Sequence, residues 1–112
     1  MPNPPAPLYQ VGRLPQVDET LRALSERAAQ LGIHKEYITS LKVILQKLRI
    51  EPLVWGDPAY QTHRQGGVVC HAIHAPLIVN YVTFEPEKVV CILKVRPLPG
   101  HALEGGSPSG DA

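Results

Sequence analysis

The apolar positions of the chain change their spacing once, near Glu51-Pro52. Before this point they recur every three or four residues, as on one face of an amphipathic helix. This spacing predicts helices over Asp18–Leu31 and His34–Leu48. After this point, β-branched and polar residues alternate with the period of two that is typical of strands. Since only Gly32 and Ile33 separate the helices, they should run antiparallel as a hairpin.

The second half of the chain predicts a small antiparallel sheet. In the final strand, strict alternation places Val89, Cys91, Leu93 and Val95 opposite Val90, Ile92, Lys94 and Arg96. Strands that are apolar on both faces belong in the middle of a sheet. We therefore expect an α+β fold in which the helical hairpin covers one face and the other face is open for a partner. The expected strands are a short one at Leu8–Val11, a weak one at Tyr60–Arg64, and stronger ones at Val68–His74, Leu77–Phe84 and Lys88–Arg96.

Capping and turn residues set the expected boundaries of the helices. Asp18 is a suitable N-cap for the first helix, and Gly32 suits a helix end. The second helix should stop at Glu51, because a residue before proline is pushed out of the helical region. Trp55-Gly56-Asp57-Pro58 then reads as a turn, in which we expect Trp55 to anchor the hairpin against the sheet.

The ends of the 112-residue chain differ in composition from its middle. Residues 1–7 are rich in proline and residues 97–112 in proline and glycine, so neither segment offers much apolar surface to offset the entropy of ordering. We therefore expect a disordered tail over residues 1–7, one folding domain over residues 8–96, and a flexible tail over residues 97–112.

Net charge and hydropathy narrow the class of protein. The formal net charge is +1, which is low for a domain that grips nucleic acid through its charge. No apolar run approaches the length of a membrane-spanning helix, and the first residues lack the order of a secretory signal. We expect a cytoplasmic protein without a membrane partner. Cys70 and Cys91 then read as reduced thiols inside strands, with a disulfide as the alternative.

One histidine-rich strand has the composition of a metal site. Cys70, His71 and His74 lie within five residues, and Cys91 is on another strand. A period of two separates His71 from the other two, so convergent ligands would need Cys91 alongside. There is no glycine-rich phosphate loop or nucleophile elbow, and Ser40 has no evident base. We expect neither a metal nor a cofactor.

The order of these elements resembles the RelE/ParE superfamily of bacterial toxin–antitoxin pairs. The resemblance covers about Leu8 to Arg96. It rests on the short first strand, the helical hairpin that ends near a proline, and three local motifs. These motifs are the Gly-x-Pro turn Gly56-Asp57-Pro58, the tyrosine strand Val79-Asn80-Tyr81-Val82, and the final strand with Val89-Val90-Cys91-Ile92.

The resemblance implies a toxin that an antitoxin neutralises on the open sheet face. It implies either an endoribonuclease that cuts mRNA on the ribosome or a ParE-like poison of DNA gyrase. Ribonuclease members carry an arginine about three positions before the strand tyrosine, and here that position is Ile78. We therefore favour a member that does not cleave RNA; a non-toxic interaction module with the same fold is the rival.

If the chain is a nuclease, its catalytic residues would be basic residues and histidines near the strand ends. Cleavage needs a base for the 2′-hydroxyl, positive charge at the phosphate and an acid for the leaving oxygen. His63 is a further candidate beside Arg64. The predicted catalytic set is Arg64, Lys94, Arg96 and His101.

Overall fold

The computed structural model describes residues 8–62, 66–85 and 87–104. The predictions for the first seven residues, for His63 and Arg64, and for residues 105–112 lie outside the described residues. The elements follow one another as β1 (Gln10–Arg13), α1 (Pro15–Gln30), α2 (His34–Ile50), α3 (Pro52–Trp55), β2 (Asp57–Thr62), β3 (Gly67–His74), β4 (Leu77–Phe84) and β5 (Val89–Pro97).

The first helix begins three residues earlier than predicted. Leu14 is its N-cap and Pro15 its first residue. Proline suits this position because its φ is already helical and the first helical N–H needs no partner within the helix. Asp18, which we expected to cap the helix, lies in its first turn and pairs with Arg13. The short strand β1 is correspondingly shifted and begins at Gln10.

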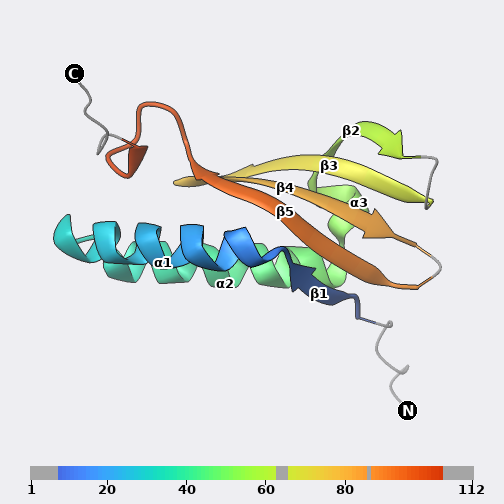
Figure 1. The fold of residues 1–112 in the computed structure, drawn as a ribbon, viewed down its shortest axis with the longest axis horizontal. Helices are drawn as coiled ribbons and strands as arrows, with labels where there is room; N and C mark the ends of the chain where they lie inside the picture. Colours follow the sequence, from blue (N-terminus) through green and yellow to red (C-terminus); the bar gives the residue numbers. More distant parts are fainter. Residues whose placement is uncertain (1–7, 63–65, 86, 105–112) are drawn as a thin grey trace, which may run out of the picture.

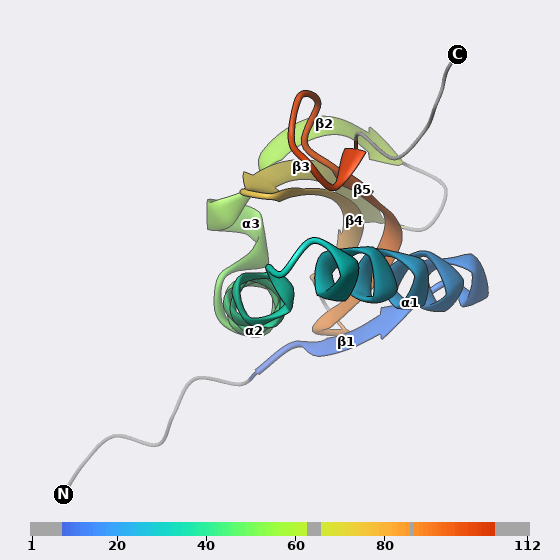
Figure 2. The same ribbon diagram turned by 90° about the vertical axis from the view of Figure 1, so that its left-hand side faces the viewer.

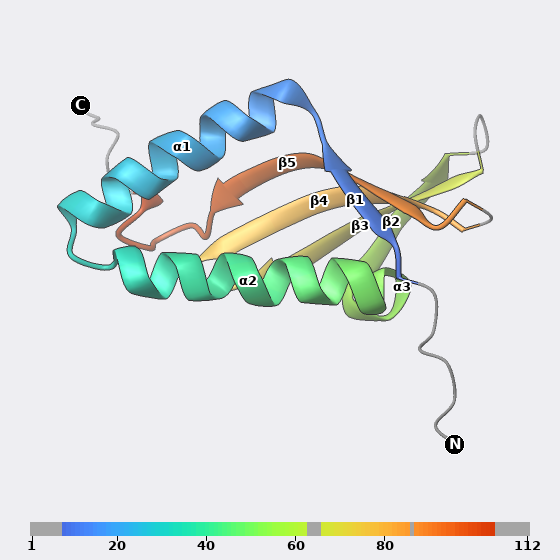
Figure 3. The same cartoon turned by 90° about the horizontal axis from the view of Figure 1, so that it is seen from below.

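The two long helices form the predicted hairpin. Gly32 has a φ of +78° in the connection between them, a conformation that glycine adopts without steric cost. The hydroxyl of Tyr37, at the start of α2, donates a hydrogen bond of 2.9 Å to the carbonyl of Leu21 on α1. From this connection the helices diverge, so that they lie further apart at the end near β1 (Figure 3).

A third, very short helix follows α2 directly. The sequence predicted that the second helix would end at Glu51-Pro52, and it does end there, since α2 stops at Ile50. The chain then forms one helical turn, α3, in which Pro52 again holds the first position. This turn was not predicted, because the sequence after Pro52 was read as a turn leading into the sheet.

The five strands form one sheet in the order β1-β5-β4-β3-β2. The three pairings from β2 to β5 are antiparallel, whereas β1 pairs in parallel with β5 at the edge. The sheet and the helical hairpin form two layers, with α1 and α2 on one face of the sheet (Figures 1 and 2). This is the predicted α+β architecture.

A bulge in β5 changes the faces that strict alternation predicted. Tyr81 pairs with Ile92, but the next pair is Asn80 with Lys94, so Leu93 is an extra residue without a partner in the ladder. Such a residue shifts the alternation of every later position. Val95 therefore joins Ile92 in the core, and the prediction that Ile92 shares a face with Lys94 is wrong.

The core lies between the helices and the sheet. Its members are buried apolar side chains of both layers: Val17, Leu24 and Ala28 of α1; Tyr37, Ile44 and Leu48 of α2; Cys70, Ala72, Leu77, Val79, Tyr81, Val90, Ile92 and Val95 of the sheet; and Leu103. None of the helices in the described part of the chain is long and apolar enough to cross a membrane.

The segment after β5 differs from the expectation that the folding body ends at Arg96. Leu103 is 1% exposed and belongs to the core. The segment turns back beyond the end of the sheet, toward the connection between α1 and α2 (Figures 1 and 3). Backbone hydrogen bonds hold it there, including one of 2.8 Å from the N–H of Leu98 to the carbonyl of Pro76. The buried side chain of Leu103 and these backbone hydrogen bonds together dock the segment.

Candidate functional site

The face of the sheet that points away from the helices is the candidate site, and we call it the open face. Its residues alternate with the core residues along each strand. Ile78 and Val82, on the central strand β4, are buried, while Ile73 on β3 is 54% exposed. The residues of the open face are Asp57 on β2; Val69, His71 and Ile73 on β3; Ile78, Asn80 and Val82 on β4; and Cys91, Lys94 and Arg96 on β5.

One row of polar residues crosses four strands of the open face. Asp57 pairs with His71, His71 with Asn80, and Asn80 with Lys94. Residues directly opposite each other in a ladder share a face, so these four side chains form a continuous polar row. Neighbouring strands lie about 5 Å apart, which places the two ends of the row about 15 Å from each other.

The row brings together groups that acid–base chemistry on a phosphodiester needs. An imidazole can accept or donate a proton, and a carboxylate beside it can orient the ring. An ammonium group stabilises negative charge that develops on phosphate oxygens. His71 is partly buried and both Asp57 and Lys94 are exposed, so all three side chains are accessible from this face.

The next row brings an arginine beside the position where the sequence lacks one. Ile78 stands at the position where ribonuclease members of the resembled superfamily carry an arginine. Its partner on β5 is Arg96, which is exposed on the same face. An arginine of the adjacent strand is therefore the ladder partner of this position. The absence of an arginine from β4 does not leave this part of the face without a positive charge.

The four predicted site residues do not all lie together in the structure. Lys94 and Arg96 lie two residues apart on the open face, as predicted. Arg64 lies outside the described residues. His101 lies away from that face, in a hollow lined by residues of α2 and by Ala75 and Pro76. Its Nδ1 accepts a hydrogen bond of 3.0 Å from the N–H of Leu103, so it takes part in docking the C-terminal segment.

The cysteine and the two histidines of β3 do not converge with Cys91. Cys70 is buried on the core face, whereas Cys91 lies on the open face and is half-buried. Both thiols are free. Within the described residues, no three side chains of His, Cys, Asp or Glu are grouped as metal ligands would be.

The tyrosine of the β4 motif is a structural residue on the core face. The Tyr81 hydroxyl donates a hydrogen bond to the carbonyl of Pro52, and its ring stacks on Trp55 with centroids 5.9 Å apart. The expectation that Trp55 anchors the hairpin to the sheet is thereby confirmed. Burial raises the pKa of Tyr81 far above its usual range and also raises the pKa of the Cys70 thiol. Both groups stay protonated and are removed from the chemistry of the open face.

Sequence reasoning missed three members of the polar row. Asp57 was read as part of a turn, His71 as a remote metal ligand, and Asn80 only as part of a family motif. Alternation placed His71 and Asn80 in two separate strand segments, but apolar residues occupy both faces of these segments, so no local pattern singled out either residue. The register that aligns them depends on turn lengths and on the bulge at Leu93, and no periodicity reveals it.

Comparison with known proteins identifies the fold through structure alone. No model of a protein family matches the sequence, and no curated protein is similar to it in sequence. The structure superposes on a chain of the crystal structure of the archaeal RelE–RelB complex from Pyrococcus horikoshii OT3, with a TM-score of 0.51. The match covers 83% of this chain and 98% of that chain at 19% sequence identity. The chain therefore has a RelE-like fold.

Proposed function

We propose that this chain is the toxin component of a toxin–antitoxin pair and that an antitoxin neutralises it on the open face. The observation that carries this proposal is the structural match, which spans 98% of a chain from a RelE–RelB complex. The matched protein is thus one whose structure was determined together with a partner.

The composition of the open face supports a protein as its partner. The row next to the polar row consists of Ile73, Ile78 and Arg96. It combines an isoleucine that is 54% exposed with an exposed guanidinium group. Apolar surface of this kind favours protein contact, and arginine is enriched in protein interfaces. The net charge of +1 is low for a protein that binds nucleic acid by charge alone. We therefore favour action through protein contact over RNA cleavage.

Induced expression in a bacterium tests the proposal. We expect growth arrest when the chain is expressed alone, and normal growth when a small reading frame adjacent to its gene is expressed with it. Arrest with DNA damage and intact transcripts indicates a gyrase poison. Normal growth of cells that contain the soluble, folded chain alone would contradict the toxin assignment and favour a non-toxic interaction module.

A matched pair of variants locates the neutralising contact. Ile73→Glu places a carboxylate on the open face, and Ala23→Glu places one on the exposed side of α1. We expect Ile73→Glu to reduce co-purification of the antitoxin at least tenfold, while Ala23→Glu leaves it unchanged. Equal binding to both variants would exclude the open face as the antitoxin site.

A second candidate function is cleavage of mRNA, and the polar row is the observation that favours it. In this case His71 would accept the proton of the attacking 2′-hydroxyl as that oxygen bonds to phosphorus and the bond to the leaving 5′-oxygen breaks. Lys94 would give the leaving oxygen a proton, and Arg96 would stabilise the negative charge on the phosphate. Primer extension on cellular mRNAs after induction would show truncated transcripts. We expect His71→Ala to remove these truncated products without reducing antitoxin binding, and intact transcripts during growth arrest would exclude this candidate.

A further inference from the structure

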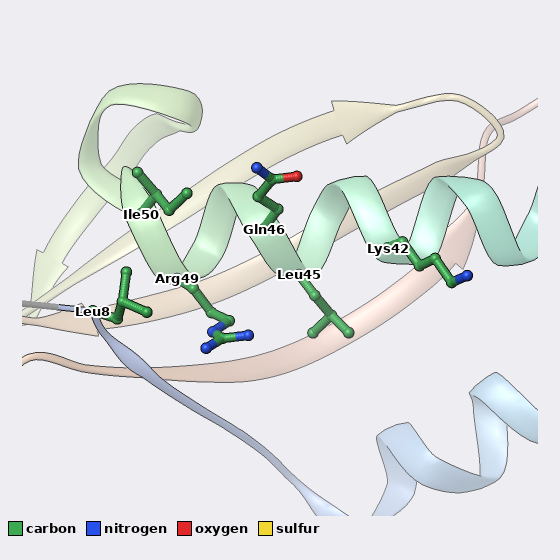
Figure 4. Close-up of a pocket in the computed structure, with 6 residues that line it drawn as sticks. All are labelled: Leu8, Lys42, Leu45, Gln46, Arg49 and Ile50. Atoms are coloured by element: carbon green, nitrogen blue, oxygen red, sulfur yellow. The ribbon is translucent and has the colours of Figure 1, made fainter. Parts of the chain in front are cut away.

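Exposed apolar residues line the outer side of α2 where it passes the start of β1. Leu8, Leu45 and Ile50 surround a hollow of about 460 Å³, and we call this surface the α2 strip (Figure 4). Their exposed fractions are 49%, 44% and 54%. Six large apolar residues are this exposed among the described residues, and half of them gather here. Such grouping distinguishes a docking surface from scattered apolar residues, which are normal on a protein surface.

The α2 strip continues into a second hollow between the helices. Leu45 lines both hollows. The second measures about 240 Å³ and reaches down to core residues such as Val79 and Ile92 of the sheet. Leu21 of α1 and Leu41 of α2 line it, and these two helices diverge from each other toward β1 (Figure 3). One apolar side chain of a partner can therefore insert between the helices while its neighbours cover the strip.

The two charged residues that line the α2 strip are both positive. Lys42 and Arg49 line it together with the neutral Gln46, and no acidic residue does (Figure 4). Among the described residues neither cation forms an ion pair, although the nearby Lys47 pairs with Glu51 at 3.0 Å. Two unpaired cations beside apolar surface fit a partner that carries carboxylates next to apolar side chains. They oppose pairing of two copies through this strip, since like charges would meet.

We propose that the α2 strip binds an acidic amphipathic helix of a partner protein. Such a helix would place apolar residues spaced three and four positions apart on Leu8, Leu45 and Ile50. Its flanking Asp and Glu residues would pair with Lys42 and Arg49. The strip lies on the helical layer, opposite the open face, so this contact is separate from the one proposed above. It requires neither toxicity nor nuclease activity.

Fluorescence anisotropy with a synthetic peptide tests this inference on the full-length chain. The probe is a labelled 16-residue helical peptide with leucines spaced three and four positions apart and glutamates on both flanks. The comparison peptides are a scrambled sequence of the same composition and a version with lysine in place of glutamate. We expect saturable binding of the acidic amphipathic peptide and at least tenfold weaker binding of the two comparison peptides.

Variants of the chain place the binding on the α2 strip. We expect Lys42→Glu with Arg49→Glu to weaken binding at least tenfold, and Leu45→Ala with Ile50→Ala to weaken it to a similar extent. Arg22→Glu, an equally exposed charge reversal on α1, should change the affinity less than twofold. Thermal melting of each variant verifies that it is folded, because these substitutions lie at the surface.

Several results would overturn the inference. These are absence of peptide binding, equal binding of the scrambled peptide, or equal affinity of the charge-reversed variant. Displacement of the peptide by single-stranded RNA or by anionic phospholipid vesicles, but not by an excess of unlabelled peptide, would assign the strip to a different class of partner. Concentration-dependent dimerisation that is lost in the Leu45/Ile50 variant would assign it to a second copy of this chain.

Discussion

Gly56 lies against Tyr81 so closely that a β-carbon at position 56 would overlap the tyrosine hydroxyl. It would also come within 3.1 Å of the β-carbon of Cys70. The hydroxyl cannot move away freely, because it donates a hydrogen bond to the carbonyl of Pro52 and the ring is stacked on Trp55. The glycine of the Gly-x-Pro turn is therefore required for space and not for an unusual φ, since its φ is −96°.

Replacement of Gly56 by alanine should destabilise the fold. Inserting a methyl group into a packed site costs about 1–3 kcal/mol, and here it would also disturb the hydrogen bond from Tyr81. Denaturant unfolding should show a lower midpoint with an unchanged slope. Gly12→Ala is the matched control, because a β-carbon at Gly12 meets no atom within 4 Å.

A double-mutant cycle tests the cause of that destabilisation. Tyr81→Phe should cost about 1–2 kcal/mol by itself, because it leaves the carbonyl of Pro52 without its donor. In the Gly56→Ala background the same change also removes the overlapping hydroxyl. The double variant should therefore lose less stability than the sum of the losses of the two single variants, by more than about 0.5 kcal/mol. Strict additivity would contradict the proposed overlap.

Leu103→Ala should reduce stability although the residue lies near the end of the chain. Its side chain is buried in the core, and truncation of a buried leucine to alanine costs about 2–5 kcal/mol. Leu31→Ala serves as the comparison, because Leu31 is 44% exposed and should have a much smaller effect. Equal unfolding midpoints for the two variants would show that the C-terminal segment does not dock.

Substitution by aspartate should destabilise the fold more at a fully buried position than at a half-buried one. Val79 is fully buried in the central strand, so Val79→Asp leaves an unpaired charge in the core and should abolish cooperative unfolding. Leu41 is half-buried beside the hollow between the helices. Leu41→Asp should lower the melting temperature but retain a folded protein, as followed by circular dichroism. A Val79→Asp variant that melts normally would contradict the core assignment.

The stability of the fold should decrease at high pH through Tyr37. Burial raises the pKa of Tyr37 to about 12, from an ordinary value of 10.0. A raised folded-state pKa means that the unfolded chain loses its proton first, so stability is constant below about pH 10 and falls between pH 10 and 12. The hydrogen bond that the Tyr37 hydroxyl donates to Leu21 is lost on deprotonation.

Tyr37→Phe isolates this contribution from that of Tyr81, whose pKa is also raised by burial. The variant lacks the hydrogen bond at every pH and should be less stable than the parent at pH 8. The difference in melting temperature between parent and variant should shrink as the pH rises from 10 to 12. A difference that stays constant over this range would mean that Tyr37 is not the titrating group.

Substitution of the basic residues of the open face should separate function from stability. Lys94 and Arg96 are exposed, and surface changes of this kind rarely alter stability by more than about 0.5 kcal/mol. If these charges act on the target, their double replacement by alanine should abolish growth arrest and leave the melting temperature nearly unchanged.

His101→Ala should lower the melting temperature and leave growth arrest intact, because His101 accepts the hydrogen bond from Leu103. Loss of toxicity in a folded His101→Ala variant would instead indicate that His101 belongs to the active site.

The amino-acid sequence alone determined the two long helices, most of the strands and the two layers. The spacing of apolar residues before Pro52 and the alternation after it were sufficient for the helical hairpin, the strands of the meander and the α+β class. These features depend on residues that are close in sequence, so a local pattern carries them. The same pattern also placed Lys94 and Arg96 on a common face, since they are two residues apart in one strand.

Only the tertiary structure decided which residues of different strands meet. The bulge at Leu93 moved Val95 into the core, and the register brought Asp57, His71 and Asn80 into line with Lys94. Leu103 also packs in the core, although it belongs to a segment whose composition predicted a free tail. In each case a contact between distant segments outweighs the local preference. Whether a side chain is buried, or a ladder takes up an extra residue, depends on packing between segments that are far apart in the sequence.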